Sequence, residues 1–178
     1  MRPYVETIVS TFIVVSVSAL QAQGVTKPTV EGVTNFAQVE TTIACAGATT
    51  PAAMAGLKKM GFASVINLRV ASEPGADIDA AAAAARAAGL NFVHLPFNAQ
   101  SPDPMLVDNF LAAVTAKANQ PAFIHCASGN RAAALWMIKR VQVDRWDVER
   151  ASAEATALGM TSAGMKSFVQ NYLDAHRR

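Results

Sequence analysis

The sequence predicts an α/β fold in which a central, mostly parallel sheet is flanked by helices. Short apolar runs alternate along the chain with helical segments of ten or more residues, separated by cap and stop signals. Helices of that length connect parallel strands through right-handed crossovers. Ligands of such sheets bind at the carboxyl ends of the strands, so we expect chemistry in the loops that follow the strands.

The elements are expected in the order helix, strand, helix, strand, helix, strand and three closing helices. Strands are expected over Ala63–Leu68, Asn91–Phe97 and Ala122–His125. Helices are expected over Pro51–Met60, Asp77–Ala88, Pro104–Asn119, Arg131–Val141, Asp147–Leu158 and Ser162–Ala175. The loops that should meet at the carboxyl edge are Arg69–Gly75, Asn98–Asp103 and Cys126–Asn130.

Each assignment has a local physical reason. Thr50 followed by Pro51 is typical of a helix start, and Gly61 of a helix end. Gly89 ends the alanine-rich second helix, in which Ala80–Ala85 is expected to be exposed. One apolar face of the third helix carries Leu106, Phe110, Leu111 and Val114. The large side chains expected in the core are Trp136, Met137 and Trp146.

Size and charge restrict the possible functions. The chain of 178 residues is long enough for one domain with a substantial core. Its formal net charge is +2, and its basic residues are dispersed instead of forming a run interleaved with aromatic residues. We therefore do not expect nucleic acid as a partner.

The N-terminal residues have the pattern of a targeting segment. Arg2 supplies a positive charge, Ile8–Leu20 is largely apolar, and small residues offer a cleavage position near residues 19–24. The apolar run is shorter than the about 20 residues that span a membrane. We expect a signal peptide over residues 1–22, a linker over 23–35 and one domain over 36–178. The domain would be periplasmic or secreted; the alternative is an uncleaved N-terminal membrane anchor.

The segment around Cys126 predicts a reactive site. An apolar strand ends at His125-Cys126, Gly129 allows a tight turn, and Arg131 opens the next helix. The N–H groups of such a loop and the helix dipole attract an anion, and Arg131 offers a planar fork for two of its oxygens. A helix N-terminus and a cation lower the pKa of a thiol to about 3.5–7.5. We expect His125 to favour the thiolate further through a hydrogen bond.

The chain has two cysteines, Cys45 and Cys126. In a compartment that permits disulfides they could form a structural bridge, which would abolish a Cys126 nucleophile. They could also form a reversible redox pair, or Cys45 could simply be buried, which is the interpretation that we favour. Two cysteines and three scattered histidines show no metal-ligand spacing, so we expect neither a metal nor a cofactor.

These residues also carry a resemblance to known families. His-Cys-x-x-Gly-x-Arg resembles the active-site loop of cysteine-dependent protein-tyrosine and dual-specificity phosphatases. More closely, the chain is similar to the bacterial phosphatase-like domain of β-lactamase-hydrolase-like proteins, which are also described as sulfurtransferases. The similarity runs from about Phe36 to Leu158 and includes Thr42–Pro51, Gly61–Arg69 and Asn91–Pro96. It implies a three-layer cysteine-phosphatase-like sandwich, with Cys126 as nucleophile and Arg131 as oxyanion binder.

The chain departs from the phosphatase pattern in three ways. Four residues separate the cysteine from the arginine, as in rhodanese sulfurtransferases, whereas phosphatases usually have five. Ala132 follows the arginine in place of Ser or Thr, and Ser128 is the candidate substitute. Asn98 or Ala99 lies where phosphatases place an acidic residue, and neither can donate a catalytic proton.

The remaining candidates surround the loop. Asp103 is the nearest carboxyl candidate for a general acid, and its alternative role is to cap the helix that begins at Pro104. Glu73 and Asp77 are weaker candidates for the acid. Arg69 is a candidate substrate binder, with a solvent-facing ion pair as the alternative. The loop residues expected to bind substrate are His125, Ala127, Ser128, Gly129 and Asn130.

Three functions remain open from the sequence. A cysteine-dependent phosphatase would form a thiophosphate on Cys126, starting from a phosphorylated small molecule or a phosphoprotein. A rhodanese-like sulfurtransferase would carry a persulfide on Cys126, would take sulfur from a sulfane-sulfur donor and would need no general acid. A binding module would capture anions without catalysis. The resemblance favours the phosphatase, and the short loop favours sulfur transfer.

Overall fold

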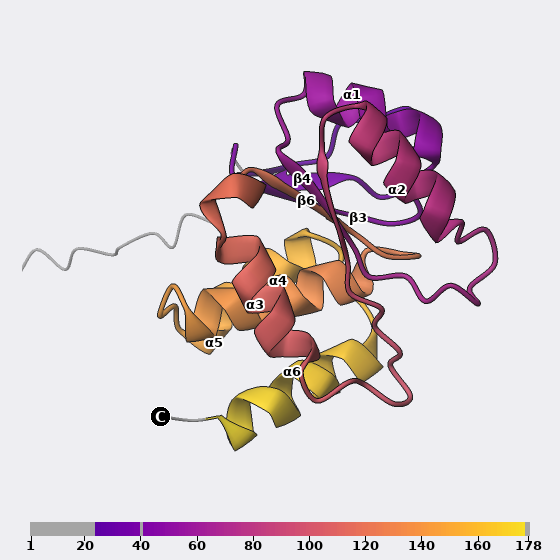
Figure 1. Ribbon diagram of the computed structural model, residues 1–178. Helices are drawn as coiled ribbons and strands as arrows, with labels where there is room; N and C mark the ends of the chain where they lie inside the picture. The colour runs from indigo at the N-terminus through magenta and orange to yellow at the C-terminus, as the bar shows by residue number, and fades with distance from the viewer. Residues whose placement is uncertain (1–23, 40, 177–178) are drawn as a thin grey trace, which may run out of the picture.

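The computed structural model describes residues 24–39 and 41–176 as a six-stranded sheet between two layers of helices (Figure 1). The strand order is β1-β2-β3-β6-β4-β5. The strands are β1 (Val25–Thr26), β2 (Ala37–Val39), β3 (Ile43–Ala46), β4 (Ser64–Asn67), β5 (Asn91–His94) and β6 (Ala122–His125). Strands β3, β6, β4 and β5 pair in parallel, and β1 and β2 extend the sheet in antiparallel fashion. The expected α/β fold with a mostly parallel sheet is therefore confirmed.

Helices cover both faces of the sheet. One face carries α1 (Met54–Lys59) and α2 (Ile78–Ala87). The other carries α3 (Leu106–Thr115), α4 (Asn130–Gln142), α5 (Val148–Ala157) and α6 (Ala163–Ala175). Successive side chains of a strand point to opposite faces, so β6 sends Phe123 into the core under α1 and α2 and Ile124 into the core under α3 to α6.

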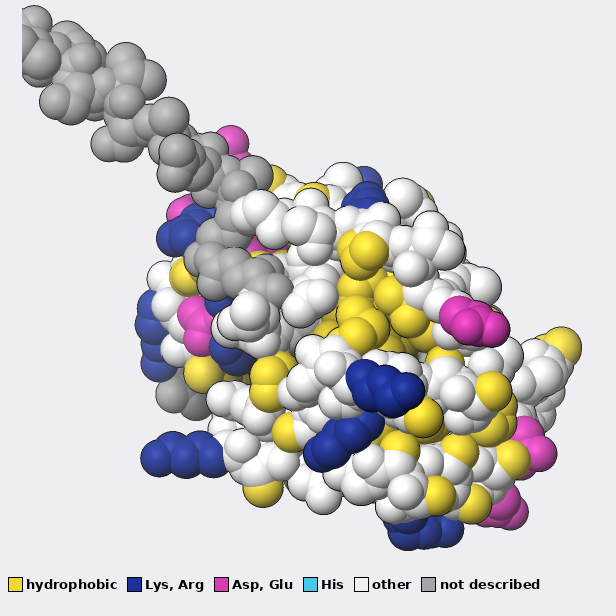
Figure 2. Space-filling view, turned by 90° about the horizontal axis from the view of Figure 1, so that it is seen from above, with side chains coloured by type: hydrophobic (Ala, Val, Ile, Leu, Met, Phe, Trp, Pro, Cys, Tyr) yellow, Lys and Arg dark blue, Asp and Glu magenta, His cyan; other side chains and the backbone are white. Residues whose placement is uncertain are grey.

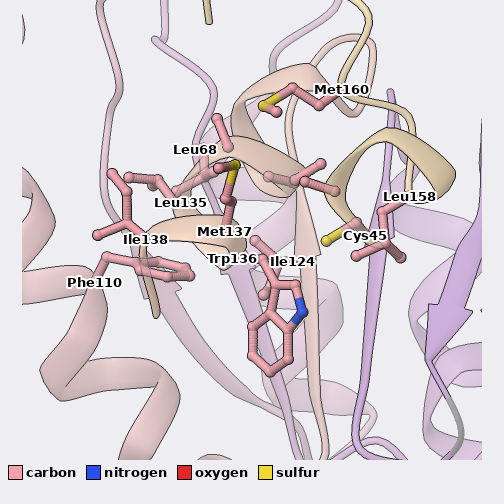
Figure 3. Close-up of a cluster of buried hydrophobic side chains, with 14 of the residues drawn as sticks. Cys45, Leu68, Phe110, Ile124, Leu135, Trp136, Met137, Ile138, Leu158 and Met160 are labelled. Carbon is pink, nitrogen blue, oxygen red and sulfur yellow. The ribbon is translucent and has the colours of Figure 1, made fainter. Parts of the chain in front are cut away.

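Cys45 is buried in the larger core, under α3 to α6. Its side chain is fully buried beside Ile124 and Leu158, in the apolar cluster that also contains Trp136 (Figure 3). Cys45 and Cys126 are both free thiols. Burial of Cys45 is therefore confirmed, and no structural disulfide joins the two cysteines.

Several predicted boundaries move for local reasons. The first helix begins as a 3-10 turn (Pro51–Ala53), and the side chain of Thr50 makes no capping hydrogen bond. Strand β5 ends at His94, shortly before Pro96, which has no N–H to donate. The third helix ends at Thr115 because Ala116 takes an extended backbone, and a separate 3-10 turn follows at Lys117–Asn119.

Three expectations about packing are corrected. Residues 24–35 are not simply a linker, because β1 pairs with β2 and Val33 bridges to Thr49. The alanine-rich helix α2 is not exposed all round, since Ala81 and Ala85 are buried against the sheet. Trp146 is only partly buried, because its ring packs between the guanidinium groups of two arginines, Arg140 and Arg150.

The expected signal peptide, residues 1–22, lies outside the described residues and stays a prediction. Among the helices that the structure describes, none has the length and apolar character to cross a membrane. On the face shown in Figure 2, Lys and Arg side chains are interspersed with acidic and neutral ones instead of forming one continuous basic surface.

Replacing Phe110 by Ala should destabilise the fold through α3. Phe110 is fully buried in the core under α3 to α6. Its truncation removes buried apolar surface and leaves a cavity, which costs about 3–5 kcal/mol. The adjacent Asn109 is exposed, so Asn109→Ala should change the free energy of unfolding by no more than about 0.5 kcal/mol. Urea unfolding of the two variants measures the difference, and equal losses would contradict this packing.

Candidate active site

The loop after β6 lies at the centre of the carboxyl edge because β6 lies between β3 and β4. Backbone hydrogen bonds attach it to both neighbours. The N–H of Leu68 donates to the carbonyl of His125 at 2.9 Å, and the N–H of Cys126 donates to Ala46 at 3.1 Å. The N–H of Ala48 donates to the carbonyl of Ala127 at 2.9 Å. The position of the loop is therefore set by the sheet.

Two glycines make this arrangement possible. Gly129 has a φ of 96° and is the N-cap of α4, a left-handed conformation that other residues adopt only with strain. Gly47 lies opposite Ser128, and a Cβ there would collide with the hydroxyl of Thr34 and lie 3.1 Å from the carbonyl of Ala127. The strand end and the loop can approach each other closely only because Gly47 has no side chain.

The thiol of Cys126 lies inside the loop. The side chain is fully buried, and its Sγ accepts a hydrogen bond from the N–H of Gly129 at 3.1 Å. Such a bond at the start of α4 places the sulfur where backbone N–H groups and the helix dipole stabilise negative charge. The local structure therefore matches the predicted anion-binding loop in its main feature.

Arg131 is held along one edge of its guanidinium group. Its Nη1 and Nη2 donate to Oε1 and Oε2 of Glu73 at 2.6 and 2.8 Å, and Nη1 also donates to the carbonyl of Phe97 at 2.8 Å. Burial disfavours the charge, but the hydrogen bond to Glu73 and the charge of Cys126 raise the pKa of Arg131 above its usual value. The side chain of Cys126 also acts on this guanidinium as a hydrogen-bonding and charged neighbour, so Arg131 lies beside the thiol.

Glu73 connects the loop after β4 to Arg131. Besides Arg131, it accepts from the N–H of Val70 at 2.9 Å and from Nε of Arg69 at 3.3 Å. Burial opposes ionisation of Glu73, but these hydrogen bonds and the Arg131 charge lower its pKa to about 2. Glu73 thus organises the site as a permanent anion. The sequence offered Glu73 only as a weaker candidate for the general acid, and its pairing with Arg131 had no signal there because the two residues lie far apart in the chain.

Two of the three loops that were expected to meet at this edge, those after β4 and β5, line a cavity of about 500 Å³ together with Arg131. Among the described residues, none of the third loop, Cys126–Asn130, lines this cavity. It is lined by Val70, Ser72, Glu73, Phe97, Asn98, Ala99, Gln100, Arg131 and Met165. Met165 belongs to α6 and lines one side of this cavity. The sequence did not indicate this position, because only the packing of α6 brings Met165 there.

His125 does not occupy the expected position. Strand alternation places its ring on the face opposite the Cys126 side chain, stacked on Phe123. The ring nitrogens approach the backbone of Gly47 and Cys126 but make no hydrogen bond within the described residues. Burial, followed by the charge of Arg69, lowers the pKa of His125 to about 4. The expected hydrogen bond that would favour the thiolate is therefore absent.

Other candidates are engaged in supporting the loops. Arg69 is buried, and its guanidinium donates to Glu73 and to the carbonyls of Pro74 and Gly75 at 2.6 and 3.0 Å, so it forms no solvent-facing ion pair. The carboxylate of Asp103 accepts from the N–H of Met105 at 2.8 Å and does not line the cavity.

The outer part of the loop contacts neighbouring segments. The hydroxyl of Ser128 accepts a hydrogen bond from the amide of Asn130 at 3.2 Å. Asn130 also accepts from the N–H groups of Thr161 and Ser162, which fixes the start of α6. Among the described residues, no three His, Cys, Asp or Glu side chains come together as a possible metal site.

Comparison with protein families agrees with this geometry. Residues 35–143 match the model of the phosphatase-like domain of beta-lactamase hydrolase-like proteins. The match covers more than half of the chain and includes the whole Cys126–Arg131 loop. The chain belongs to this family. The resemblance inferred from the sequence is therefore confirmed for this phosphatase-like domain.

Solved structures share the fold of this phosphatase-like domain. A DUF442 protein from Shewanella putrefaciens CN-32, described as a candidate phosphatase, has a TM-score of 0.67 and 19% identity over 83% of this chain and 94% of its own. TpbA from P. aeruginosa has a TM-score of 0.64 and 20% identity over 82% and 88%. The catalytic domain of the PP-IP phosphatase SIW14 from S. cerevisiae has a TM-score of 0.64 and 19% identity over 83% and 91%. No curated protein matches the chain.

Glu73 should make the stability of the phosphatase-like domain depend on acidic pH. Folding lowers its pKa from 4.5 to about 2, so its ionisation stabilises the fold fully above pH 4.5. That contribution is lost as the pH falls from 4.5 to about 2. Glu73→Gln should therefore flatten the decline of the free energy of unfolding in this window, measured by urea titration. Asp79→Asn, on exposed surface of α2, is the control, and an unchanged decline in Glu73→Gln would refute the role of Glu73.

Proposed function

We propose that this protein is a cysteine-dependent phosphatase of the protein-tyrosine and dual-specificity type. The observation that carries this proposal is the pairing of a thiol with a restrained arginine at the start of α4. The Sγ of Cys126 accepts from the N–H of Gly129, and the charge of Cys126 acts directly on Arg131. A phosphoryl group needs both a nucleophile and donors for its equatorial oxygens, and this loop offers the two together.

The reaction would proceed in two displacements. The Cys126 thiolate attacks phosphorus, and the guanidinium of Arg131 and the loop N–H groups stabilise the equatorial oxygens. Water then hydrolyses the thiophosphate and restores the thiolate. Because Cys126 is fully buried, the phosphoryl group would have to enter the loop to reach the sulfur.

Structural neighbours support a phosphorylated substrate. One solved structure is a cysteine-to-serine variant of TpbA in complex with phosphotyrosine, and SIW14 is a PP-IP phosphatase solved with citrate. By analogy, the substrate of this chain would be a phosphorylated small molecule or a phosphoprotein. We place the enzyme in the periplasm or outside the cell because residues 1–22 have the pattern of a signal peptide.

Sulfur transfer is the second candidate, and one observation favours it. The loop has four residues between Cys126 and Arg131, and Ala132 is fully buried where phosphatases have a hydroxyl to assist the leaving thiolate. A persulfide on Cys126 would need only an anionic sulfur donor held by Arg131. The same protein sample can test both reactions.

Phosphate release from 4-nitrophenyl phosphate should depend on the loop. Cys126→Ser should abolish it, because the hydroxyl is a far weaker nucleophile than a thiolate. Arg131→Lys should lower kcat/KM by at least about 10²-fold, since an ammonium group cannot bind two oxygens in one plane. Arg86→Lys, on exposed surface of α2, is the matched control and should retain full activity.

The outcomes separate the candidate functions. Thiocyanate formation from thiosulfate and cyanide, without phosphate release from the ester, would establish sulfur transfer and reject the phosphatase. Sulfate binding that survives Cys126→Ser, with neither product formed, would indicate an anion-binding module. Full phosphatase activity in Arg131→Lys would disprove the role of the guanidinium.

A further inference from the structure

The cavity beside Arg131 indicates which phosphoryl compounds the site can cleave. Resting on the phosphatase activity, we propose that the substrate is an anhydride of phosphoric acid, either an acyl phosphate or a phosphoanhydride. The leaving group of such a compound departs as a stable anion. The enzyme therefore needs to bind that anion but does not need to donate a proton to it.

The basicity of the leaving group decides whether the reaction needs a general acid. Protonation by a positioned general acid accelerates such reactions by about 10²–10⁴-fold. It matters most for basic leaving groups, such as a phenolate, whose conjugate acid has a pKa of about 10. A carboxylate or phosphate leaving group corresponds to a pKa of about 4–6 and leaves readily without a proton.

Glu73 provides the only carboxylate among the described residues that line the cavity. Its two oxygens accept hydrogen bonds from Arg131, and its pKa of about 2 keeps it ionised throughout the physiological range. A carboxylate in that state has no proton to give. Glu73 therefore supports Arg131 and does not act on the leaving group.

Neighbouring acids and histidines are committed elsewhere. Asp103 accepts from the N–H of Met105, and Asp77 accepts from the N–H of Ala80 as the N-cap of α2. His94 is hydrogen-bonded through Nε2 to the carbonyl of Arg69 at 2.8 Å. His125 lies across the sheet, and neither His94 nor His125 lines the cavity.

The side chain of Asn98 offers a hydrogen-bond donor for an anionic leaving group. It belongs to the loop after β5 and lines the same cavity as Arg131 and Glu73. Its Oδ1 accepts from the N–H of Gln100 at 3.1 Å, which leaves the NH₂ group as the donor of this side chain. An amide N–H can stabilise a departing carboxylate or phosphate by a charge-assisted hydrogen bond, without proton transfer. The hydroxyl of Ser72 lines the same cavity.

The reaction balances without a protein acid. The thiolate electron pair of Cys126 forms the S–P bond, and the P–O bond to the leaving group breaks with its pair on oxygen. The carboxylate or phosphate leaves as an anion. Water then attacks phosphorus, the S–P bond breaks to restore the thiolate, and the two protons of the water remain with the released phosphate or pass to solvent.

A series of substrates tests the proposal on the full-length protein. Enzyme-dependent phosphate release is measured for acetyl phosphate, pyrophosphate, 4-nitrophenyl phosphate and phenyl phosphate, with the Cys126→Ser variant as the blank for spontaneous hydrolysis. We expect kcat/KM for phenyl phosphate to be at least about 10²-fold below that for acetyl phosphate, which is the lower range of the missing acid contribution.

The results distinguish this inference from the proposed function. Similar kcat/KM values for phenyl and acetyl phosphate, both lost in Cys126→Ser, would overturn the anhydride preference while the phosphatase stands. Phosphate release from none of the four compounds, including the activated 4-nitrophenyl ester, would overturn the phosphatase itself.

A variant with a carboxyl group in the cavity provides a second test. Asn98→Asp puts a carboxyl group in the cavity and should raise the ratio of kcat/KM for phenyl phosphate to that for acetyl phosphate at least about tenfold, with its optimum shifted toward acidic pH. Ser101→Asp adds the same charge to the exposed part of this loop, outside the cavity lining, and should leave the ratio unchanged. Equal ratios in both variants and the parent would remove Asn98 from the leaving-group side.

Discussion

The ion pair between Arg131 and Glu73 is the interaction on which the site depends. It joins the first turn of α4 to the loop after β4 through two hydrogen bonds of 2.6 and 2.8 Å. A mostly buried guanidinium needs such a partner, because an unpaired buried charge is strongly destabilising. The same guanidinium also interacts with the side chain of Cys126. One carboxylate therefore holds the arginine beside the thiol.

The sheet determines which residues can take part in the chemistry. His125 and Cys126 are adjacent in sequence, yet strand alternation sends them to opposite faces of β6. The thiol faces α4 and its N-terminal N–H groups, and the imidazole faces the smaller core under α1 and α2. Two residues that are adjacent in the sequence therefore have different surroundings: the thiol lies in the loop beside Arg131, and the imidazole is buried against Phe123.

The polar character of the cavity follows from the hydrogen bonds that Glu73 and Asn98 make in its lining and that Asp103 makes outside it. Glu73 is ionised and engaged, Asp103 faces the start of α3, and the amide of Asn98 lines the cavity. This combination attracts and holds negative charge but does not supply protons. The family relationship establishes the kind of domain, whereas under the proposed activity these side chains would determine which leaving groups it can release.

Local sequence predicted the helices, the strands β4, β5 and β6 and the Cys126 loop, but not the strands β1, β2 and β3. Apolar runs, capping residues and glycines such as Gly129 act over a few neighbouring residues, so the strand, the loop and α4 around Cys126 could be predicted. Contacts between distant segments could not be. The partnership of Glu73 with Arg131, the wall from Met165 and the pairing of β1 with β2 bring together residues far apart in the chain. Only the packing of helices and loops on the sheet decides such contacts, because their energy comes from burial and charge pairing that no local pattern encodes.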